Sequence, residues 1–298
     1  MPYTPTGREL EDRSLPLDAY HKSIDALQLD VHSLYGTTQV RASHEWFKAN
    51  NRRTMIIERS AFSGVGKYGS RWLGDNFSQN GYMGFSVTGI MMHNIIGIPL
   101  AGSDICGFLG TVDAELCARW HVVGAFYPFS RNHNDYGADD QEPYLWNTTY
   151  VDTKFGSMSY TDIMREAIHK KYDLISYYYT ELTHIHEDGG PFYKPLFFSF
   201  PDDDNSYSNQ IFNVMLGEAL KLSINSQGIQ HEKAYYFPPM TSWCNVYDFS
   251  QHCFTTEEEG LEISRSSAID HFDLHIRGGF IVPMHDSKKS KIMKTHDL

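Results

Sequence analysis

The sequence has no excess of positive charge and no long apolar run. Its 298 residues include 25 lysines and arginines against 37 aspartates and glutamates, and the formal charge of -12 repels polyanions, so nucleic acid is not expected as a partner. No stretch of about 18 apolar residues is present, so no membrane span is predicted. Residues 1–14 lack the charged and apolar regions of a signal peptide, and the ends of the chain therefore indicate no compartment.

Motifs for nucleotide chemistry are missing as well. P-loop, G-x-S-x-G and G-x-G-x-x-G patterns do not occur, which leaves nucleotide and nucleophilic-serine chemistry without support. Residues 184–190 are rich in histidine and residues 201–205 in aspartate, but neither segment has the ligand spacing of a metal site. The sequence therefore predicts neither a metal nor a cofactor.

Cysteine is scarce and shows no metal-type C-x-x-C pair. The four cysteines are Cys106, Cys117, Cys244 and Cys253. They could form two short-range disulfides, Cys106 with Cys117 and Cys244 with Cys253, which would indicate an oxidising compartment. Buried free thiols are the alternative, and the cysteine count alone leaves both open.

What the chain does contain is a repeated strand and helix pattern. With 41% hydrophobic and 14% aromatic residues it has enough apolar surface for one large domain or two. Short apolar runs followed by polar loops and helices occur four times. The predicted strands are residues 54–57, 95–102, 124–129 and 195–200, and the predicted helices are 17–34, 38–48, 81–94, 113–120 and 160–186. This alternation predicts an α/β fold with a parallel sheet.

The pattern changes after residue 201. The later segments are short, aromatic or β-branched and separated by turns, which predicts an antiparallel β-sandwich. We therefore expect two domains, residues 1–205 and residues 206–298.

One loop at a strand end is the candidate active site. Residues 58–76 lead from the apolar run 54–57 through Arg59 and several glycines to Asp75, which lies in a G-D-N turn. In barrel enzymes, polar residues just past the C-terminal ends of the strands perform the chemistry. The alternative for Asp75 is a carboxylate that only accepts hydrogen bonds within its turn.

Four motifs near the expected strand ends show a family resemblance. They are ERSAFSGVGKYGSRWLGDN (58–76), GIPLAGSDICGFLG (97–110), ELCARW (115–120) and GAFYPFSRNHN (124–134). In this order and spacing they resemble the catalytic domain of glycoside hydrolase family 31, most of all its eukaryotic acid α-glucosidase and sucrase-isomaltase branch. DVHSLYG upstream and PLFFSFPDDD and RGGFIVP downstream extend the resemblance over residues 1–283.

The resemblance implies the C-terminal half of a (β/α)8 TIM barrel, strands 5 to 8, followed by a β-sandwich domain. A retaining glycosidase needs two carboxylates about 5 to 5.5 Å apart, an acid/base and a nucleophile. The family's nucleophile lies in a W-x-D-M-N-E motif that does not occur here, and MPYTPTG resembles the segment after that motif. The chain is therefore expected to begin downstream of the nucleophile, and its half barrel to self-associate through exposed strand edges.

The resemblance also implies roles for single residues. Asp75 matches the general acid/base, which protonates the glycosidic oxygen and later activates water, and such an acid needs apolar neighbours such as Trp72. Arg59 matches an arginine that contacts the sugar in the −1 subsite, and a surface ion pair with Glu58 is the alternative. Asp104 matches an aspartate in the polar network below that subsite, and a helix N-cap is the alternative.

Three further residues match positions in the sugar pocket. His133 matches a histidine that hydrogen-bonds a sugar hydroxyl, and Trp72 and Phe108 match aromatic residues that line the pocket. Without the motifs, all three would be interpreted as structural. The family also has cysteines in the places of Cys106 and Cys117, so this pair is expected to form a disulfide.

The function implied by the resemblance is that of an α-glucosidase-type glycoside hydrolase. Its substrates would be oligosaccharides from which terminal α-linked glucose is released with retention. The same resemblance implies the secretory pathway, lysosomal or extracellular. The alternative is a catalytically inactive remnant that binds carbohydrate or a protein partner, because the nucleophile motif is missing.

Overall fold

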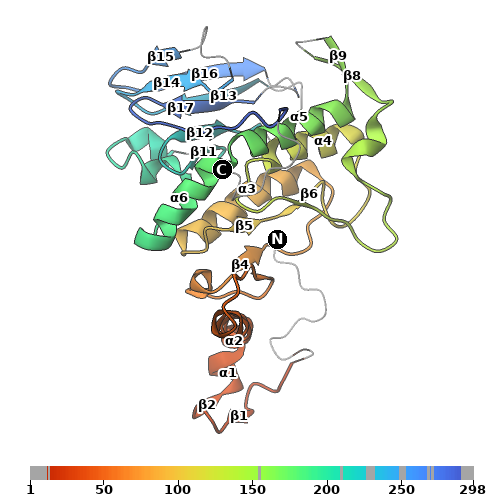
Figure 1. Cartoon of the computed structure of the whole chain (residues 1–298), viewed down its shortest axis with the longest axis vertical. Helices are drawn as coiled ribbons and strands as arrows, with labels where there is room; N and C mark the ends of the chain where they lie inside the picture. Colours follow the sequence, from red (N-terminus) through yellow and green to blue (C-terminus); the bar gives the residue numbers. More distant parts are fainter. Residues whose placement is uncertain are drawn as a thin grey trace.

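Parallel strands alternate with helices in the first part of the chain, and antiparallel strands follow (Figure 1). The computed structural model describes residues 12, 14–153, 156–208, 211–225, 232–247, 253–266, 269 and 272–289. In Figure 1 the first helices lie at the bottom, the antiparallel strands at the top, and most other helices between them.

The N-terminal part begins with a hairpin. Its elements are β1 (Tyr20–His21), β2 (Ala26–Leu27), α1 (Gln28–Val31) and α2 (Tyr35–Ala49). The helix predicted at residues 17–34 is wrong for its first part, because Asp25 adopts the left-handed backbone conformation, φ 52°, and closes the hairpin by accepting a hydrogen bond from the Tyr20 hydroxyl. Residues 28–34 are helical, as predicted. The predicted helix at residues 38–48 is confirmed by α2.

Short parallel strands form two small sheets in the α/β part. They are β3 (Ile57–Glu58), β4 (Ser70–Trp72), β5 (Ala101–Gly102), β6 (Asp104–Ile105) and β7 (Arg131–Asn132). Strand β3 pairs with β4, β4 with β5, and β6 with β7, all parallel. Because Ser103 alone separates β5 from β6, these strands occupy four adjacent positions in chain order. Four such positions correspond to half of a (β/α)8 barrel.

Strand β4 was predicted as part of a loop. Its residues, Ser70–Trp72, are not an apolar run. They fit the strand because polar or aromatic side chains contact them on both faces. The Arg71 Nε donates to His93 Nε2 at 3.3 Å, whereas the Trp72 ring lies 4.7 Å from the Arg131 guanidinium. An apolar-run criterion cannot find a strand whose faces are covered in this way.

Two predicted barrel strands are wrong. Residues 124–129 form the end of a helix and turns, with the Ala125 N–H donating to the His121 carbonyl at 2.9 Å, and the strand follows as β7. Residues 195–200 begin with the last residue of β10 (Tyr193–Pro195), which pairs antiparallel with a later strand, and continue as a 3-10 turn. A buried apolar run does not distinguish a strand from a buried helix end.

Four longer helices accompany the strands. They are α3 (Asn80–Ile95), α4 (Ala114–Gly124), α5 (Tyr160–Asp173) and α6 (Ile175–Asp188). Asp113 caps the first turn of α4, since its Oδ1 accepts from the Leu116 N–H at 2.8 Å. The single helix predicted at 160–186 is instead two helices, α5 and α6, which are separated at the buried Leu174. The strand predicted at 95–102 is shortened to β5, and its first residue, Ile95, still belongs to α3.

A hairpin that was not predicted from the sequence precedes α5. Its strands are β8 (Tyr150–Thr153) and β9 (Gly156–Ser159), which pair antiparallel. The hairpin leads directly into α5, whose first turn is capped by the Ser159 hydroxyl accepting from the Asp162 N–H at 3.1 Å.

Antiparallel strands form the last part of the chain, as predicted. They are β10, β11 (Asn213–Leu216), β12 (Leu220–Ser223), β17 (Leu274–Arg277), β14 (Ser242–Asn245) and β15 (Cys253–Thr255) in one sheet, and β13 (Glu232–Phe237) and β16 (Leu261–Ser266) in a second. A disulfide joins Cys244 to Cys253 across β14 and β15. Strand β10 lies before the expected division at residues 205 and 206, and that division stays a prediction.

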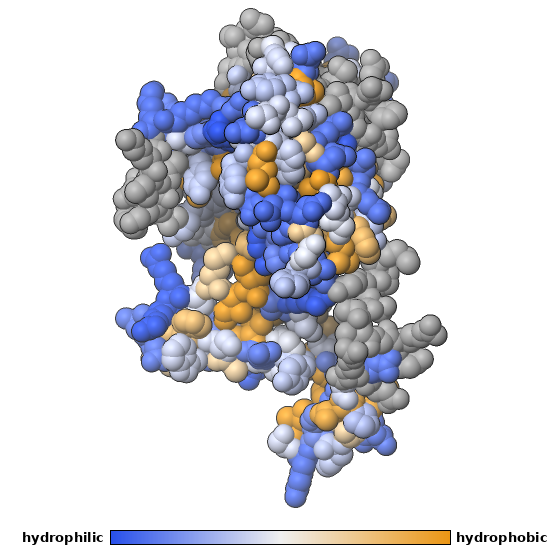
Figure 2. All heavy atoms as spheres, turned by 90° about the vertical axis from the view of Figure 1, so that its right-hand side faces the viewer, coloured by the Kyte–Doolittle hydropathy of each residue, from blue (hydrophilic) through white to orange (hydrophobic). Residues whose placement is uncertain are grey.

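One hydrophobic core joins the helices of the α/β part to the sandwich. It contains buried side chains from α3, α4, α5, β12 and β17: Met83, Trp120, Met164, Leu222 and Leu274. Large apolar side chains nearer the N-terminus are exposed instead, namely Tyr35 at 76%, Trp46 at 57% and Met55 at 67%. Figure 2 shows a group of apolar residues at mid-height on one flank.

Candidate active site

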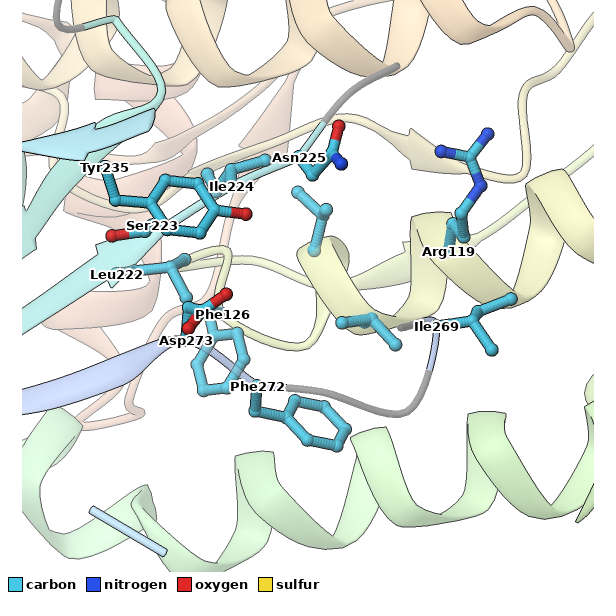
Figure 3. Close-up of a pocket in the computed structure, with 12 residues that line it drawn as sticks. Arg119, Phe126, Leu222, Ser223, Ile224, Asn225, Tyr235, Ile269, Phe272 and Asp273 are labelled. Atoms are coloured by element: carbon cyan, nitrogen blue, oxygen red, sulfur yellow. The ribbon is translucent and has the colours of Figure 1, made fainter. Parts of the chain in front are cut away.

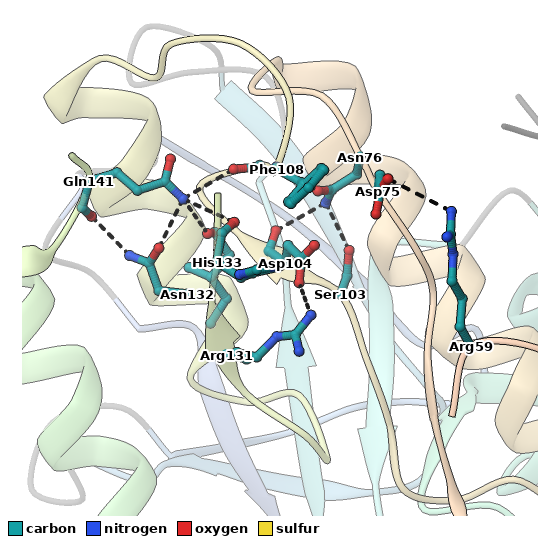
Figure 4. Close-up of polar contacts among 12 residues, drawn as sticks. Arg59, Asp75, Asn76, Ser103, Asp104, Phe108, Arg131, Asn132, His133 and Gln141 are labelled. Atoms are coloured by element: carbon teal, nitrogen blue, oxygen red, sulfur yellow. Dashed lines mark hydrogen bonds and ion pairs between the residues drawn. The ribbon is translucent and has the colours of Figure 1, made fainter. Parts of the chain in front are cut away.

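Polar side chains converge at the C-terminal ends of the parallel strands (Figure 4). Arg59 follows β3, Asp75 follows β4, Asp104 begins β6, and Arg131 and His133 belong to β7 or follow it. Because parallel strands end at one edge of a sheet, residues far apart in sequence meet there. This is the edge at which barrel enzymes carry their active sites.

Asp75 lies against Arg59. The Arg59 Nη2 is 3.7 Å from Asp75 Oδ2, and the side chains are 44% and 10% exposed, respectively. The turn that brings Asp75 to this position contains Gly74 at φ +95°, a backbone conformation that suits glycine. Asp75 is thus a nearly buried carboxylate with a partly exposed cation beside it. The alternative pairing of Arg59 with Glu58 is not favoured, because Glu58 faces Arg71 across the β3–β4 pair.

Trp72 lies beside two guanidinium groups and the His133 ring, and Phe108 lies on from His133. The Arg131 Cζ is 4.7 Å and the Arg59 Cζ 5.4 Å from the Trp72 ring centroid. The His133 ring is 6.1 Å from Trp72 and 4.9 Å from Phe108. All six residues predicted for the site are therefore gathered at one strand edge, and three of them form an aromatic wall. Flat rings of this kind fit apolar faces of a ligand.

Asp104 is the buried anion of the site. Its side chain is fully buried, and Oδ1 accepts a hydrogen bond from Arg131 Nη2 at 2.8 Å. Burial raises the pKa of Asp104 to about 6, Arg131 opposes that shift, and the charge of Asp75 adds to it. Asp104 lies in β6, so the N-cap alternative is wrong.

His133 is held as a neutral ring at neutral pH. Burial lowers its pKa, the charge of Arg131 lowers it further, and the charges of Asp75 and Asp135 oppose both effects. A neutral imidazole has one donor and one acceptor nitrogen, which suits a hydroxyl partner that also donates and accepts.

The sequence analysis missed Asn76. Its amide nitrogen donates to Ser103 Oγ at 2.9 Å and to the Asp104 carbonyl at 3.0 Å, and its Oδ1 accepts from the Phe108 N–H at 3.0 Å. Asn76 is therefore the residue that ties the Asp75 loop to the loop after β6. Its position next to Asp75 in the motif was the only available signal.

Gln141 is the second residue that was missed. Its Nε2 lies within hydrogen-bond distance of Asn132 Oδ1 at 2.9 Å, the Gly107 carbonyl at 3.1 Å and the His133 carbonyl at 3.2 Å. The main-chain carbonyl of Gln141 accepts a hydrogen bond from Asn132 Nδ2 at 2.9 Å. The side chain is 3% exposed. Gln141 therefore fixes the backbone that presents His133.

Replacing Gln141 by alanine is expected to lower the free energy of unfolding by about 2 to 4 kcal/mol, because several buried polar groups lose their partner. Chemical denaturation measures the change, and Gln39→Ala on the exposed face of α2 is the matched control. A Gln141→Ala variant as stable as the control would show that these hydrogen bonds do not hold the loop.

A disulfide lies directly behind the site. Cys106 at the end of β6 is bonded to Cys117 on α4, as the family resemblance implied. The His121 Nδ1 is 2.8 Å from the Cys117 carbonyl and 3.4 Å from Cys106 Sγ. These three residues are the one close group of metal-type side chains among the described residues, but both sulfurs are used in the disulfide. They therefore offer no thiolate to a metal.

A separate cavity lies between α4 and the sandwich (Figure 3). Its volume is about 40 Å³, and its lining includes Arg119, Phe126, Leu222, Tyr235 and Asp273. Such a volume holds a few water molecules rather than a sugar ring. None of its lining residues belongs to the group around Asp75.

Two parts of the sequence match domain models of known protein families. Residues 8–181 match the glycosyl hydrolases family 31 TIM-barrel domain, and residues 189–282 match the glycosyl hydrolase family 31 C-terminal domain. The chain belongs to glycoside hydrolase family 31. The resemblance seen in its motifs is thereby confirmed, as is the α/β fold with a following β-sandwich.

Relatives of this family 31 chain are named as glucosidases. It is 35% identical to lysosomal alpha-glucosidase of Bos taurus over 86% of the chain and 27% of that protein. It is 33% identical to probable maltase-glucoamylase 2 of Homo sapiens over 99% of the chain and 11% of that protein. The chain thus spans about a quarter of the first relative and a smaller part of the second.

Solved structures of the family have the same fold. The glucosidase II alpha subunit superposes with a TM-score of 0.82 at 26% identity, covering 92% of this chain and 28% of that one. A family 31 dextranase of Flavobacterium johnsoniae superposes with a TM-score of 0.78 over 90% of this family 31 chain and 32% of the dextranase. Among the described residues, no helix has the length and apolar character needed to cross a membrane.

Proposed function

We propose that this chain carries the acid/base half of an α-glucosidase active site. The observation that supports it most is the position of Asp75, nearly buried after β4, 3.7 Å from Arg59 and beside the aromatic wall. The substrates would be oligosaccharides with terminal α-linked glucose, in keeping with relatives named as alpha-glucosidase and maltase-glucoamylase.

In the first chemical step, Asp75 would donate its proton to the glycosidic oxygen as the bond between that oxygen and C1 breaks. A second carboxylate forms a bond to C1 and gives a glycosyl ester. The Asp75 carboxylate then takes a proton from water as the water oxygen attacks C1 and displaces the ester. Each of the two substitutions inverts the configuration at C1, so the released glucose keeps the α configuration.

The second carboxylate is not supplied by the described residues near Asp75. Asp75 is close enough for its charge to raise the pKa of Asp104, but Asp104 is fully buried and its Oδ1 accepts from Arg131. The W-x-D-M-N-E motif does not occur in the sequence. We therefore propose that a segment other than residues 1–298 supplies the nucleophile.

The remaining site residues would bind the sugar in the −1 subsite. Arg59 offers guanidinium N–H groups to hydroxyls beside Asp75, and His133 offers a neutral ring nitrogen. Trp72 and Phe108 would lie against the sugar faces. Asp104 would act indirectly, by fixing Arg131 under Trp72.

The same proposal includes the compartment of the chain and its self-association. Two disulfides favour the oxidising secretory pathway, either lysosomal or extracellular. The open β3 edge and the exposed Tyr35, Trp46 and Met55 favour self-association. A carbohydrate-binding remnant without activity is the second candidate, and the missing nucleophile motif is the observation that favours it.

The isolated 298-residue chain is expected to hydrolyse a chromogenic α-glucoside no faster than buffer, because Asp75 in the acid/base role lacks the second carboxylate that attacks C1. To separate the two candidates, the chain is joined to the preceding barrel half of lysosomal alpha-glucosidase of Bos taurus. A folded chimaera that hydrolyses maltose supports the enzyme, and a folded but inert one supports the remnant. Saturable hydrolysis by the isolated chain, lost in Asp75→Asn, would instead require a substitute nucleophile within these residues.

A further inference from the structure

Two acceptor motifs for N-linked glycans occur in the sequence. They are N-F-S at Asn76 and N-T-T at Asn147, the only N-x-S/T triplets among the 298 residues. Such motifs receive an oligosaccharide in the oxidising secretory pathway, the compartment that the two disulfides favour. Because a glycan is bulky and needs a surface position, the surroundings of each asparagine decide which motif can carry one.

Asn76 has no room for a sugar. Its side chain is buried, and its amide nitrogen uses both hydrogens, donating to Ser103 Oγ at 2.9 Å and to the Asp104 carbonyl at 3.0 Å. Linkage to a sugar replaces one of these hydrogens and places a ring in packed space. A chain modified at Asn76 would therefore lose contacts that hold the Asp75 loop.

Asn147 lies instead on an exposed turn. It follows the 3-10 helix Pro143–Trp146 and precedes β8, and its side chain and those of Thr148 and Thr149 are all exposed. Figure 1 shows the hairpin of β8 and β9 at the upper right of the molecule. An oligosaccharide on Asn147 would therefore extend into solvent.

The backbone on both sides of Asn147 is anchored to the start of α5. The Pro143 carbonyl accepts a hydrogen bond from the Thr161 hydroxyl at 2.6 Å, and the Thr149 carbonyl accepts from the Tyr160 N–H at 3.0 Å. The glycan would therefore leave the surface from a fixed point.

Two large exposed rings flank this point. Tyr144 is 66% and Tyr150 61% exposed. Side chains three residues apart eclipse each other in a 3-10 helix, and Asn147 continues the helical backbone with φ −73° and ψ −14°, so Tyr144 lies on the same side as Asn147. Tyr150 begins β8 three residues further on, with its side chain on the exposed face. A hydrated glycan leaving from Asn147 would cover apolar ring surface that otherwise faces water.

We infer that Asn147 carries an N-linked oligosaccharide that covers Tyr144 and Tyr150. The donor is an oligosaccharide linked to a lipid diphosphate. The Asn147 Nδ2 forms a bond to C1 of the first sugar as the bond from C1 to the phosphate oxygen breaks, the lipid diphosphate leaves with the electron pair, and a base of the transferase takes one amide proton. The inference rests on the proposed function only for the compartment and does not depend on the acid/base role of Asp75.

The test expresses the 298-residue chain in cultured animal cells behind a cleavable secretion signal, which fixes the compartment. An N-glycosidase is expected to increase the gel mobility of the secreted chain by the loss of one glycan and to convert the linked asparagine to aspartate, which peptide mass spectrometry locates at position 147. Thr149→Ala is expected to lower the occupancy about tenfold or more, because the motif loses its hydroxyl. Thr148→Ala, which changes the neighbouring exposed threonine of the same motif, is the matched control and keeps the glycan. Ser78→Ala removes the other motif, leaves Asn76 in place and is expected to change nothing.

Coverage of the rings is measured by iodination of tyrosines in the secreted wild type and in Asn147→Gln. Tyr144 and Tyr150 are expected to react about threefold or more faster in the variant, because the glycan no longer covers them. Tyr35, which is 76% exposed on α2 at the other end of the molecule in Figure 1, is the control and is expected to react equally in both.

A secreted chain without a glycan, or with its glycan at Asn76, would overturn the inference. Equal iodination of Tyr144 and Tyr150 in the wild type and Asn147→Gln would show that the glycan does not cover the rings, which also contradicts it. Failure of the α-glucosidase proposal would appear in the hydrolysis assays of the chimaera and would leave all of these results unchanged.

Discussion

Replacing Asp75 by asparagine in the chimaera is expected to lower kcat/KM for maltose by about 1,000-fold or more, because a neutral amide cannot donate a proton to the leaving oxygen. Asparagine keeps the size of the side chain, so the unfolding midpoint should stay close to that of the parent. The measurement is steady-state hydrolysis of maltose at several pH values.

Asp135→Asn is the matched control, since Asp135 is an exposed carboxylate in the loop after His133. It is expected to keep most of the parent's activity. An Asp75→Asn chimaera with parental kcat/KM would remove Asp75 from the acid/base role, whatever the behaviour of the control. A loss of activity that follows a loss of folding in Asp75→Asn would instead show that Asp75 acts in the structure.

The second large effect is expected at the buried ion pair. Asp104→Ala leaves Arg131 without its anion beneath Trp72 and should lower the free energy of unfolding by about 3 to 5 kcal/mol. Denaturant unfolding of the 298-residue chain measures it, and Asp152→Ala on the exposed face of β8 is the control. In a double-mutant cycle with Arg131→Met, the two losses should be strongly non-additive. Additive losses would mean that Asp104 and Arg131 do not stabilise each other.

The same aspartate predicts how stability changes with pH. Its pKa is raised from 3.8 to about 6, so between these values the folded protein keeps a proton that the unfolded chain has released. This contribution to stability is therefore present in full below about pH 4 and is lost as the pH rises through about 6, by roughly 2 to 3 kcal/mol. The unfolding free energy of the wild type should fall relative to that of Asp104→Asn over this range. A constant difference would contradict the raised pKa.

The candidate site could be predicted from the sequence because its residues lie in motifs with fixed spacing to the strand ends. Asp75, Asp104 and His133 each follow or begin one of the short parallel strands, so the motifs located them correctly even where the predicted strand boundaries were wrong. Asp104 was predicted as a site residue although residues 95–102, the strand predicted before it, are mostly the end of a helix and a turn. Matching a motif tolerates such errors, since it does not depend on periodicity.

Contacts between distant segments could not be predicted in this way. Gln141 holds the His133 backbone and the carbonyl of Gly107 through one amide group, and nothing in the sequence around it shows that the loop folds back. Strand β4 was missed because Arg71 and Trp72 are covered by groups from α3 and β7 rather than by an apolar run. The break at Leu174, which is buried and has φ −99° and ψ 4°, was also missed, because the apolar periodicity of α5 and α6 predicts a single helix.

The claim that Asp75 protonates the departing oxygen is tested most directly by changing the leaving group. The Asp75→Asn chimaera and its parent are assayed on maltose and on a dinitrophenyl α-glucoside, whose weakly basic leaving group departs without a proton. The account predicts a loss of about 1,000-fold or more on maltose and of less than about tenfold in the glycosylation step on the activated substrate. Equal losses on both substrates would show that Asp75 does not act as the acid.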